Sequence, residues 1–70
     1  PWDLVFGNLH AELVVRLAPD LLRLTGHMLI TAGILADREA LVHDALEPAL
    51  TCTHRLAEGP WVGLVHERRP

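Results

Sequence analysis

Hydrophobic and polar positions follow one another along the first half of the chain in blocks that predict a strand, a helix and a second strand. Residues 4–9 are apolar without alternation, which is typical of a short strand buried on both faces. Residues 10–24 carry apolar side chains at helical spacing. Residues 27–32 form another short apolar run, and Gly33 is expected to end it. Two such strands joined by a helix predict parallel pairing through a right-handed crossover.

Pro19 interrupts the helical pattern of residues 10–24. Because proline lacks the N–H that would bond to the preceding turn, it predicts either a kink or two short helices, the second opening at Pro19 and Asp20. Thr25 and Gly26 follow the last apolar position of this segment, and we expect them to end the helix.

The second half of the chain predicts one more helix and a hairpin. Asp37 is a good N-cap for this helix, and Pro48 lies where the helix is expected to finish. The apolar stripe of the helix comprises Leu41, Val42, Ala45, Leu46 and Ala49. Residues 51–57 and 61–67 are predicted strands, because the loop Glu58-Gly59-Pro60 between them is of the type that joins antiparallel strands. The chain is therefore predicted to be α/β, in the order strand-helix-strand-helix-strand-strand, with a mixed sheet.

Composition limits the class of protein. Seventy residues, half of them hydrophobic, make at most one small globular domain of marginal stability. The apolar runs are broken well before the roughly 20 residues that a membrane span needs, so a membrane protein is not expected. The net charge is −3 and the six basic residues are scattered arginines, which argues against direct nucleic-acid binding. A single cysteine suits a reducing compartment, and the cytoplasm is the expected location.

Asn8 is the leading candidate for a functional residue. It stands at the carboxyl end of the first predicted strand, and in open α/β sheets ligands gather at that end. Asparagine is also a favourable helix N-cap, so a purely structural role for Asn8 remains open at this point. No glycine-rich phosphate-binding loop stands before or after it.

The remaining polar residues do not predict a catalytic or metal site. The five histidines stand at positions 10, 27, 43, 54 and 66, so none are paired at the i, i+3 or i, i+4 spacing of a helical metal site. Cys52 and His54 alternate onto one face of a predicted strand, which would set a thiol beside an imidazole; a small buried thiol is the interpretation that we favour. No catalytic acid–base pair is visible, and we predict neither a catalytic residue nor a metal ligand.

Five short segments in a fixed order carry a resemblance to a known family. They are Asp3-Leu4-Val5 through Asn8-Leu9, Ala11-Glu12-Leu13, Leu17-Ala18-Pro19, Gly33-Ile34-Leu35 and Glu58-Gly59-Pro60-Trp61-Val62. Over nearly its whole length the chain resembles the C-terminal part of the PrmA family, the bacterial methyltransferases that modify a large-subunit ribosomal protein.

The resemblance implies the C-terminal half of a Rossmann-like class I methyltransferase sheet that uses S-adenosylmethionine, with residues 1–70 as a single partial domain. It implies that the final strand inserts antiparallel beside the second strand, leaving residues 51–57 at the edge. It also implies that Asn8 lies by the methyl donor and the target amine. The glycine-rich loop and the acidic ribose ligand would belong to a missing N-terminal half, so the isolated chain is expected to be inactive and to bind the donor poorly.

Two positions depart from the family pattern. The turn Leu24-Thr25-Gly26-His27 is shorter than the Pro-Gly-Gly type of turn expected before the second strand, and His10 stands where an aliphatic or aromatic residue is expected. The partners implied are the N-terminal half of the parent protein and a ribosomal protein substrate.

Two other interpretations stay open. The chain could be a non-catalytic α/β interaction fragment that self-associates, because the first strand would leave an apolar sheet edge unpaired. It could also belong to a class I methyltransferase of other specificity. The residues after Asn8 disfavour the second interpretation, since Leu9-His10-Ala11 does not match the Asn-Pro-Pro-aromatic motif of enzymes that act on planar amides or bases.

Overall fold

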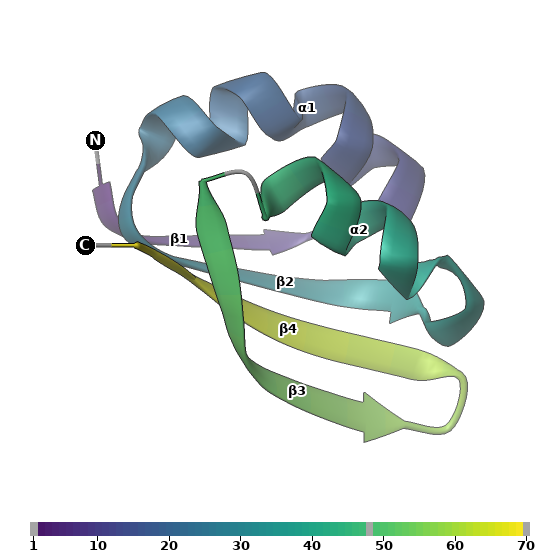
Figure 1. Cartoon of the computed structure of the whole chain (residues 1–70). Coiled ribbons are helices and arrows are strands. Elements are labelled where there is room, and N and C mark those ends of the chain that lie inside the picture. The colour runs from purple at the N-terminus through teal and green to yellow at the C-terminus, as the bar shows by residue number, and fades with distance from the viewer. Residues whose placement is uncertain (1, 48, 70) are drawn as a thin grey trace.

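The computed structural model describes residues 2–47 and 49–69, and all the predicted helices and strands are present (Figure 1). In chain order the elements are β1 (Trp2–Asn8), α1 (Ala11–Leu24), β2 (Thr25–Leu35), a 3-10 turn η1 (Ala36–Arg38), α2 (Glu39–Leu46), β3 (Leu50–Glu58) and β4 (Trp61–Arg68). Pro48, where the second helix was expected to finish, lies outside the described residues.

The four strands form one mixed sheet in the order β1-β2-β4-β3. β1 pairs with β2 in parallel, as the strand-helix-strand pattern predicted. β4 lies antiparallel between β2 and β3, which leaves β3 at the edge of the sheet. The α/β class and the inserted final strand are therefore confirmed.

Both helices cover the same face of the sheet, and the core lies between them and the strands (Figure 1). Along β2 and β4 the buried side chains alternate with half-buried ones, as a sheet with one covered face requires. The buried apolar core comprises Ala11, Val14, Ala18, Leu21, Leu29, Ile34, Val42, Leu46, Leu50, Val62 and Leu64.

The prediction that the first strand is buried on both faces is wrong. Trp2, Leu4 and Phe6 are 69%, 57% and 65% exposed, whereas Val5 between them packs against the core. Successive side chains of a strand point to opposite faces, and in this chain only one face is covered by helices. The opposite face, which we call the open face, carries the side chains of Leu4 and Phe6 beside those of Met28 and Ile30 on β2.

We predict that the isolated chain self-associates through the open face and the unpaired edge of β1, because water-exposed apolar side chains there have no cover. Sedimentation velocity over a range of protein concentrations should show dimers or larger species. Phe6→Glu should shift the chain to the monomer, whereas Leu41→Glu, which changes a part-exposed leucine on α2 instead, should not. A stable monomer of the unmodified chain at high concentration would contradict this prediction.

α1 runs as one helix through Pro19, so of the two predicted alternatives, a kink or two short helices, the second is wrong. A proline inside a helix costs about 3 kcal/mol. Val14 and Leu21 are buried beneath the helix, and burying each of them stabilises the fold by about 1.5–3 kcal/mol. The packed face of the helix therefore outweighs the hydrogen bond that Pro19 cannot make.

α1 ends at Leu24 and passes into β2 without a loop, which accounts for the short turn in the sequence. The side chain of Thr25 donates a hydrogen bond to the carbonyl of Leu21 at 2.7 Å. Arg68, at the end of β4, donates from Nε to the carbonyl of Thr25 at 2.8 Å and from Nη2 to the carbonyl of Leu22. The carbonyl of Leu21 also accepts the backbone N–H of Thr25, so the bond that satisfies a free carbonyl at the helix end is the one from Arg68 to Leu22.

Two predicted boundaries differ in the segment that follows. Gly33 does not end the second strand, because β2 continues to Leu35 through a register shift between Thr31 and Ile34. Asp37 is not an N-cap, because it lies within η1; the N-cap position of α2 is Arg38, whose side chain makes no capping hydrogen bond. The extra 3-10 turn displaces the start of α2 to Glu39.

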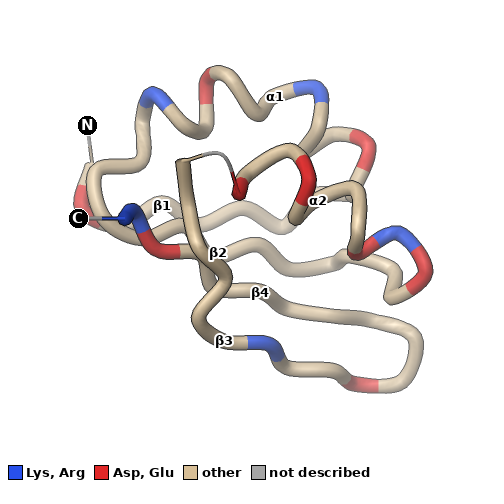
Figure 2. Tube along the Cα trace, in the orientation of Figure 1, with Lys and Arg blue, Asp and Glu red and all other residues tan. Residues whose placement is uncertain are grey.

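Charged residues are dispersed over the fold (Figure 2). Arginines lie on α1, in η1 and on β3 and β4, so they are spread over several elements. No positive stripe runs along any described element. No helix in the described part of the chain is long and apolar enough to cross a membrane.

Candidate functional site

The carboxyl ends of β1 and β2 lie side by side, because the two strands are parallel. Asn8 is the last residue of β1 and pairs with Ala32 of β2. The backbone N–H of Leu9 continues the ladder by donating to the carbonyl of Ala32 at 3.0 Å. The side chain of Asn8 is thus presented at the edge of the sheet where the chain leaves β1 for α1, and it is exposed.

Asn8 is not the cap of α1. The N-cap position belongs to His10, which has extended backbone angles and makes no capping hydrogen bond with its side chain. Within the described residues the carboxamide of Asn8 has no hydrogen-bond partner. Of the two interpretations left open by the sequence, the helix-cap role of Asn8 is wrong.

Gly33 fixes the surroundings of the Asn8 carboxamide. A Cβ atom at position 33 would lie 2.3 Å from Oδ1 of Asn8, far inside van der Waals contact. Gly33 also has a φ of 74°, a left-handed conformation that is strained for residues with a side chain. The bulge in β2 therefore needs glycine for two reasons, and one of them is the space that the amide of Asn8 occupies.

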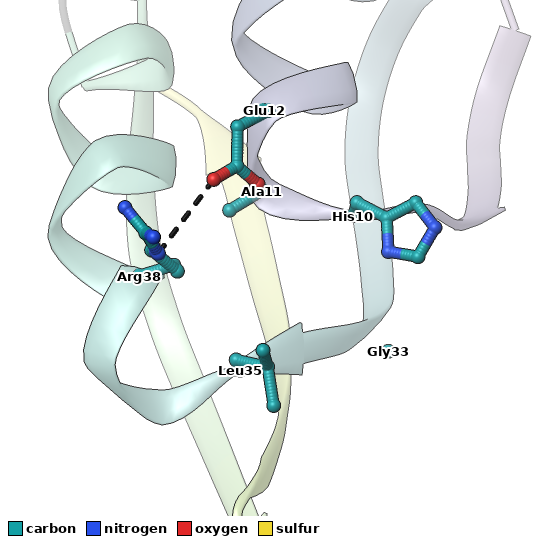
Figure 3. Close-up of a pocket in the computed structure, with 6 residues that line it drawn as sticks. All are labelled: His10, Ala11, Glu12, Gly33, Leu35 and Arg38. Carbon is teal, nitrogen blue, oxygen red and sulfur yellow. Dashed lines mark ion pairs between the residues drawn. The ribbon is translucent and has the colours of Figure 1, made fainter.

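A shallow hollow adjoins this edge (Figure 3). Its lining residues are His10, Ala11, Glu12, Gly33, Leu35 and Arg38. Arg38 faces Glu12 across the hollow, with Nε 3.6 Å from Oε2, and both side chains are more than half exposed. An exposed ion pair of this kind stabilises little. The hollow provides a polar recess beside Gly33, and His10 borders it from the connection between β1 and α1.

The structure does not bring the thiol of Cys52 beside the imidazole of His54. A register shift in β3 pairs Cys52 with His66 but His54 with Val65, and adjacent residues of β4 point to opposite faces. The bulge therefore turns the two side chains to different faces. Cys52 is half-buried, and burial raises the pKa of its thiol.

Cys52 instead faces two histidines that sequence spacing did not connect. One ligand atom of each of His43, Cys52 and His66 lies within 4.8 Å of the other two. Nδ1 of His43 on α2 is 3.2 Å from Nε2 of His66 on β4. His66 is fully buried, and burial, together with the nearby His43, lowers its pKa to about 4. We refer to His43, Cys52 and His66 as the HCH cluster.

Glu39 holds His43 in place from the other side. Its Oε2 is 2.9 Å from Nε2 of His43, and Arg55 donates from Nε to both of its carboxylate oxygens at 2.9 Å. Burial alone would raise the pKa of Glu39, but the hydrogen bonds from His43 and Arg55 outweigh burial and lower it. The cluster is joined by tertiary contacts between α2, β3 and β4, so no local spacing in the sequence could reveal it.

Comparisons with known proteins agree along the whole chain. A family model described as "Ribosomal protein L11 methyltransferase (PrmA)" matches residues 1–69. The chain is 41% identical to the ribosomal protein L11 methyltransferase of Pelobacter propionicus, over 96% of this chain and 23% of that protein. It is 43% identical to the one of Thermus thermophilus, over 97% of this chain and 28% of that protein.

A solved structure with a similar name has a similar fold. The ribosomal protein L11 methylase from Lactobacillus delbrueckii subsp. bulgaricus superposes with a TM-score of 0.88 and 27% sequence identity, covering 97% of this chain and 37% of that chain. The chain spans about a quarter of the length of the curated relatives it matches.

Proposed function

The chain belongs to the ribosomal protein L11 methyltransferase (PrmA) family, and from that membership we propose that it is the C-terminal part of the catalytic domain of an S-adenosylmethionine-dependent enzyme that methylates amino groups of a ribosomal protein. The chain is a partial piece of such a protein, and residues 1–70 are one partial domain of it. For this chain's own residues, the proposal rests on the amide of Asn8, which lies at the carboxyl end of β1 and does not cap α1.

The donor, when bound, supplies a methyl group on a sulfonium that an amine nitrogen attacks in line. Such a reaction depends on holding two groups in register far more than on acid–base residues. The edge around Asn8 fits that requirement, since it offers a free carboxamide and, at Gly33, space held open by the backbone. We propose that Oδ1 of Asn8 accepts a hydrogen bond from the N–H of the target amine and so directs the nitrogen lone pair towards the donor methyl.

The chain holds only one wall of the donor site. Its sequence contains no glycine-rich loop at a strand-helix turn, and backbone N–H groups of such a loop are what hold the donor in Rossmann-like folds. The open face of the sheet is the second sign of a missing part, because parallel strands are normally covered on both faces, whereas the parallel pair β1–β2 exposes apolar side chains on this one. We propose that the missing N-terminal part of the parent protein, which is longer than this chain, covers the open face and completes the site.

Calorimetric titration tests this division of the site. The isolated chain should give no heat of binding at micromolar S-adenosylmethionine, because it lacks the loop that binds the donor. A full-length protein that contains this chain should bind the donor and transfer methyl groups to the ribosomal protein, measured by mass spectrometry of the product.

Two outcomes would contradict different parts of the proposal. Micromolar binding by the isolated chain would refute the proposal that the chain holds only one wall of the donor site. It would leave the proposed methyl-transfer reaction untouched. A full-length protein that binds the donor but methylates no ribosomal protein would refute the substrate.

A second candidate function follows from the open face. If the chain acts without the rest of the enzyme, its exposed apolar side chains favour a non-catalytic fragment that self-associates. The residues encoded upstream discriminate between the two. A glycine-rich strand-turn-helix there, with an acidic residue at the end of the next strand, supports the enzyme.

A further inference from the structure

The HCH cluster brings three metal-binding side chains together from three elements of the fold. His43 comes from α2, Cys52 from β3 and His66 from β4, and their ligand atoms lie within 4.8 Å of one another. None of these residues lies on β1, whose carboxyl end carries Asn8. The cluster is separate from the proposed methyl-transfer site.

Hydrogen bonding within the fold pairs only one of the two ring nitrogens of His66, its Nε2, which lies 3.2 Å from Nδ1 of His43. The side chain is fully buried, and its Nδ1 is one of two buried side-chain polar atoms in the described part of the chain that have no hydrogen-bond partner; the other is Oγ1 of Thr31. Leaving such a group unpaired costs about 1–3 kcal/mol.

The spacing within the cluster suits a tetrahedral ion. Zinc–nitrogen distances of about 2.0–2.1 Å place two nitrogen ligands about 3.3 Å apart around a tetrahedral centre. Nδ1 of His43 and Nε2 of His66 are 3.2 Å apart, with ring planes inclined at 48°. The thiol of Cys52 is opposite His66 in the sheet, which makes it the third ligand.

Two carboxylates complete the surroundings. Oε1 of Glu47 lies 3.8 Å from Nδ1 of His43, and its side chain is half exposed, so it has the freedom to move onto an ion as the fourth ligand. Glu39 accepts from Nε2 of His43, as carboxylates do behind metal-bound histidines, and this contact leaves the lone pair of Nδ1 free to point into the cluster. Arg55 holds Glu39 in that position.

We propose that His43, Cys52 and His66 form a binding site for zinc or a similar borderline divalent cation, with Glu47 as the fourth ligand and Glu39 as the residue that orients His43. Because the ligands come from a helix and two strands, the ion acts as a structural link between α2 and the β3–β4 hairpin. Mixed histidine and cysteine ligands favour zinc over magnesium or calcium. The site does not depend on the proposed methyl transfer.

Cobalt(II) provides the test, because it takes tetrahedral zinc sites and reports its ligands by absorption. The chain is purified with a chelator and a reductant, exchanged into chelator-free buffer and titrated with cobalt. One equivalent should bind, with a thiolate-to-cobalt charge-transfer band in the near ultraviolet and the intense visible bands of a tetrahedral ion. Zinc should displace the cobalt and raise the thermal unfolding temperature.

Variants assign the ligands. Cys52→Ser should abolish the charge-transfer band. If circular dichroism shows that this variant does not fold, His43→Gln, on the more accessible helix, serves as the test instead and should weaken binding at least tenfold. Glu39→Gln should weaken binding by about 10–100-fold. His54→Gln is the matched control, since it removes an imidazole of the same hairpin that points to the opposite face. Absence of the charge-transfer band in the unmodified chain, or binding that survives both Cys52→Ser and His43→Gln unchanged, would overturn the proposal.

Discussion

Replacing Asn8 by alanine in a full-length protein that contains this chain is expected to lower kcat/KM for methyl transfer about 100-fold, the loss that a misplaced reacting group typically causes. The fold should remain intact. Asn8 is exposed and does not cap α1, so the change in free energy of unfolding should stay within about 0.5 kcal/mol. Initial rates of methyl incorporation measure the first effect, and urea unfolding measures the second.

Gly33→Ala provides a coupled control for Asn8. The added methyl group would stand 2.3 Å from Oδ1 of Asn8, so it should displace the carboxamide and reduce activity as well. In the Asn8→Ala background the clash is gone, and Gly33→Ala should then have a much smaller additional effect on rate. The strain of a left-handed alanine, about 1 kcal/mol, would remain in both backgrounds. Wild-type activity in Asn8→Ala, or additive effects of the two changes, would show that Asn8 does not position the substrate.

Acidification is expected to destabilise the metal-free chain through His66. Its pKa is about 4 in the folded protein and 6.5 in the unfolded chain, so between these values the unfolded state binds a proton that the folded state excludes. Stability contributed by the neutral imidazole is therefore complete above pH 6.5 and is lost as the pH falls towards 4. The difference corresponds to about 3 kcal/mol. Glu39, whose pKa is lowered, adds a loss in the same direction once the pH falls below its ordinary value of 4.5.

Urea unfolding at a fixed protein concentration, with a chelator present, measures this effect between pH 7 and pH 4.5. His66→Gln should flatten the dependence of stability on pH over that range, because glutamine does not titrate. His54→Gln, which changes an exposed imidazole of the same hairpin, is the control and should keep the wild-type slope. Equal slopes in the unmodified chain and in His66→Gln would contradict the prediction.

The element order and the sheet topology were predictable for different reasons. Helical spacing and short apolar runs located each element, because both patterns are local. The position of the final strand between β2 and β3 came from the family resemblance alone, since the hairpin pattern at Gly59 says nothing about which strand pairs with β2. Burial of the first strand was predicted wrongly. An apolar run indicates that a strand favours burial on both faces, but it does not show whether this chain contains the segments that would cover both faces.

The candidate site shows a similar division. The position of Asn8 at the carboxyl end of β1 was predictable because the end of a strand is a local feature, and the structure excludes the helix-cap role by placing His10 at the N-cap. Gly33 was taken for a strand end, because the sequence does not reveal a positive φ in a bulge. The HCH cluster was missed because its residues meet only through tertiary contacts between α2, β3 and β4. The expected pair of Cys52 and His54 was wrong because one irregularity in β3 turns the two side chains to different faces.

Arg68 also bears on the order in which this part of the fold is completed. It donates to carbonyl groups that lie 43 and 46 residues earlier in the chain, at the end of α1. During synthesis those carbonyl groups are hydrogen-bonded by water until Arg68 has emerged, although the helix itself is made of local contacts. The last turn of the first helix thus depends on a residue translated more than 40 positions later, which couples that turn to closure of the hairpin and makes the two fold as one cooperative unit.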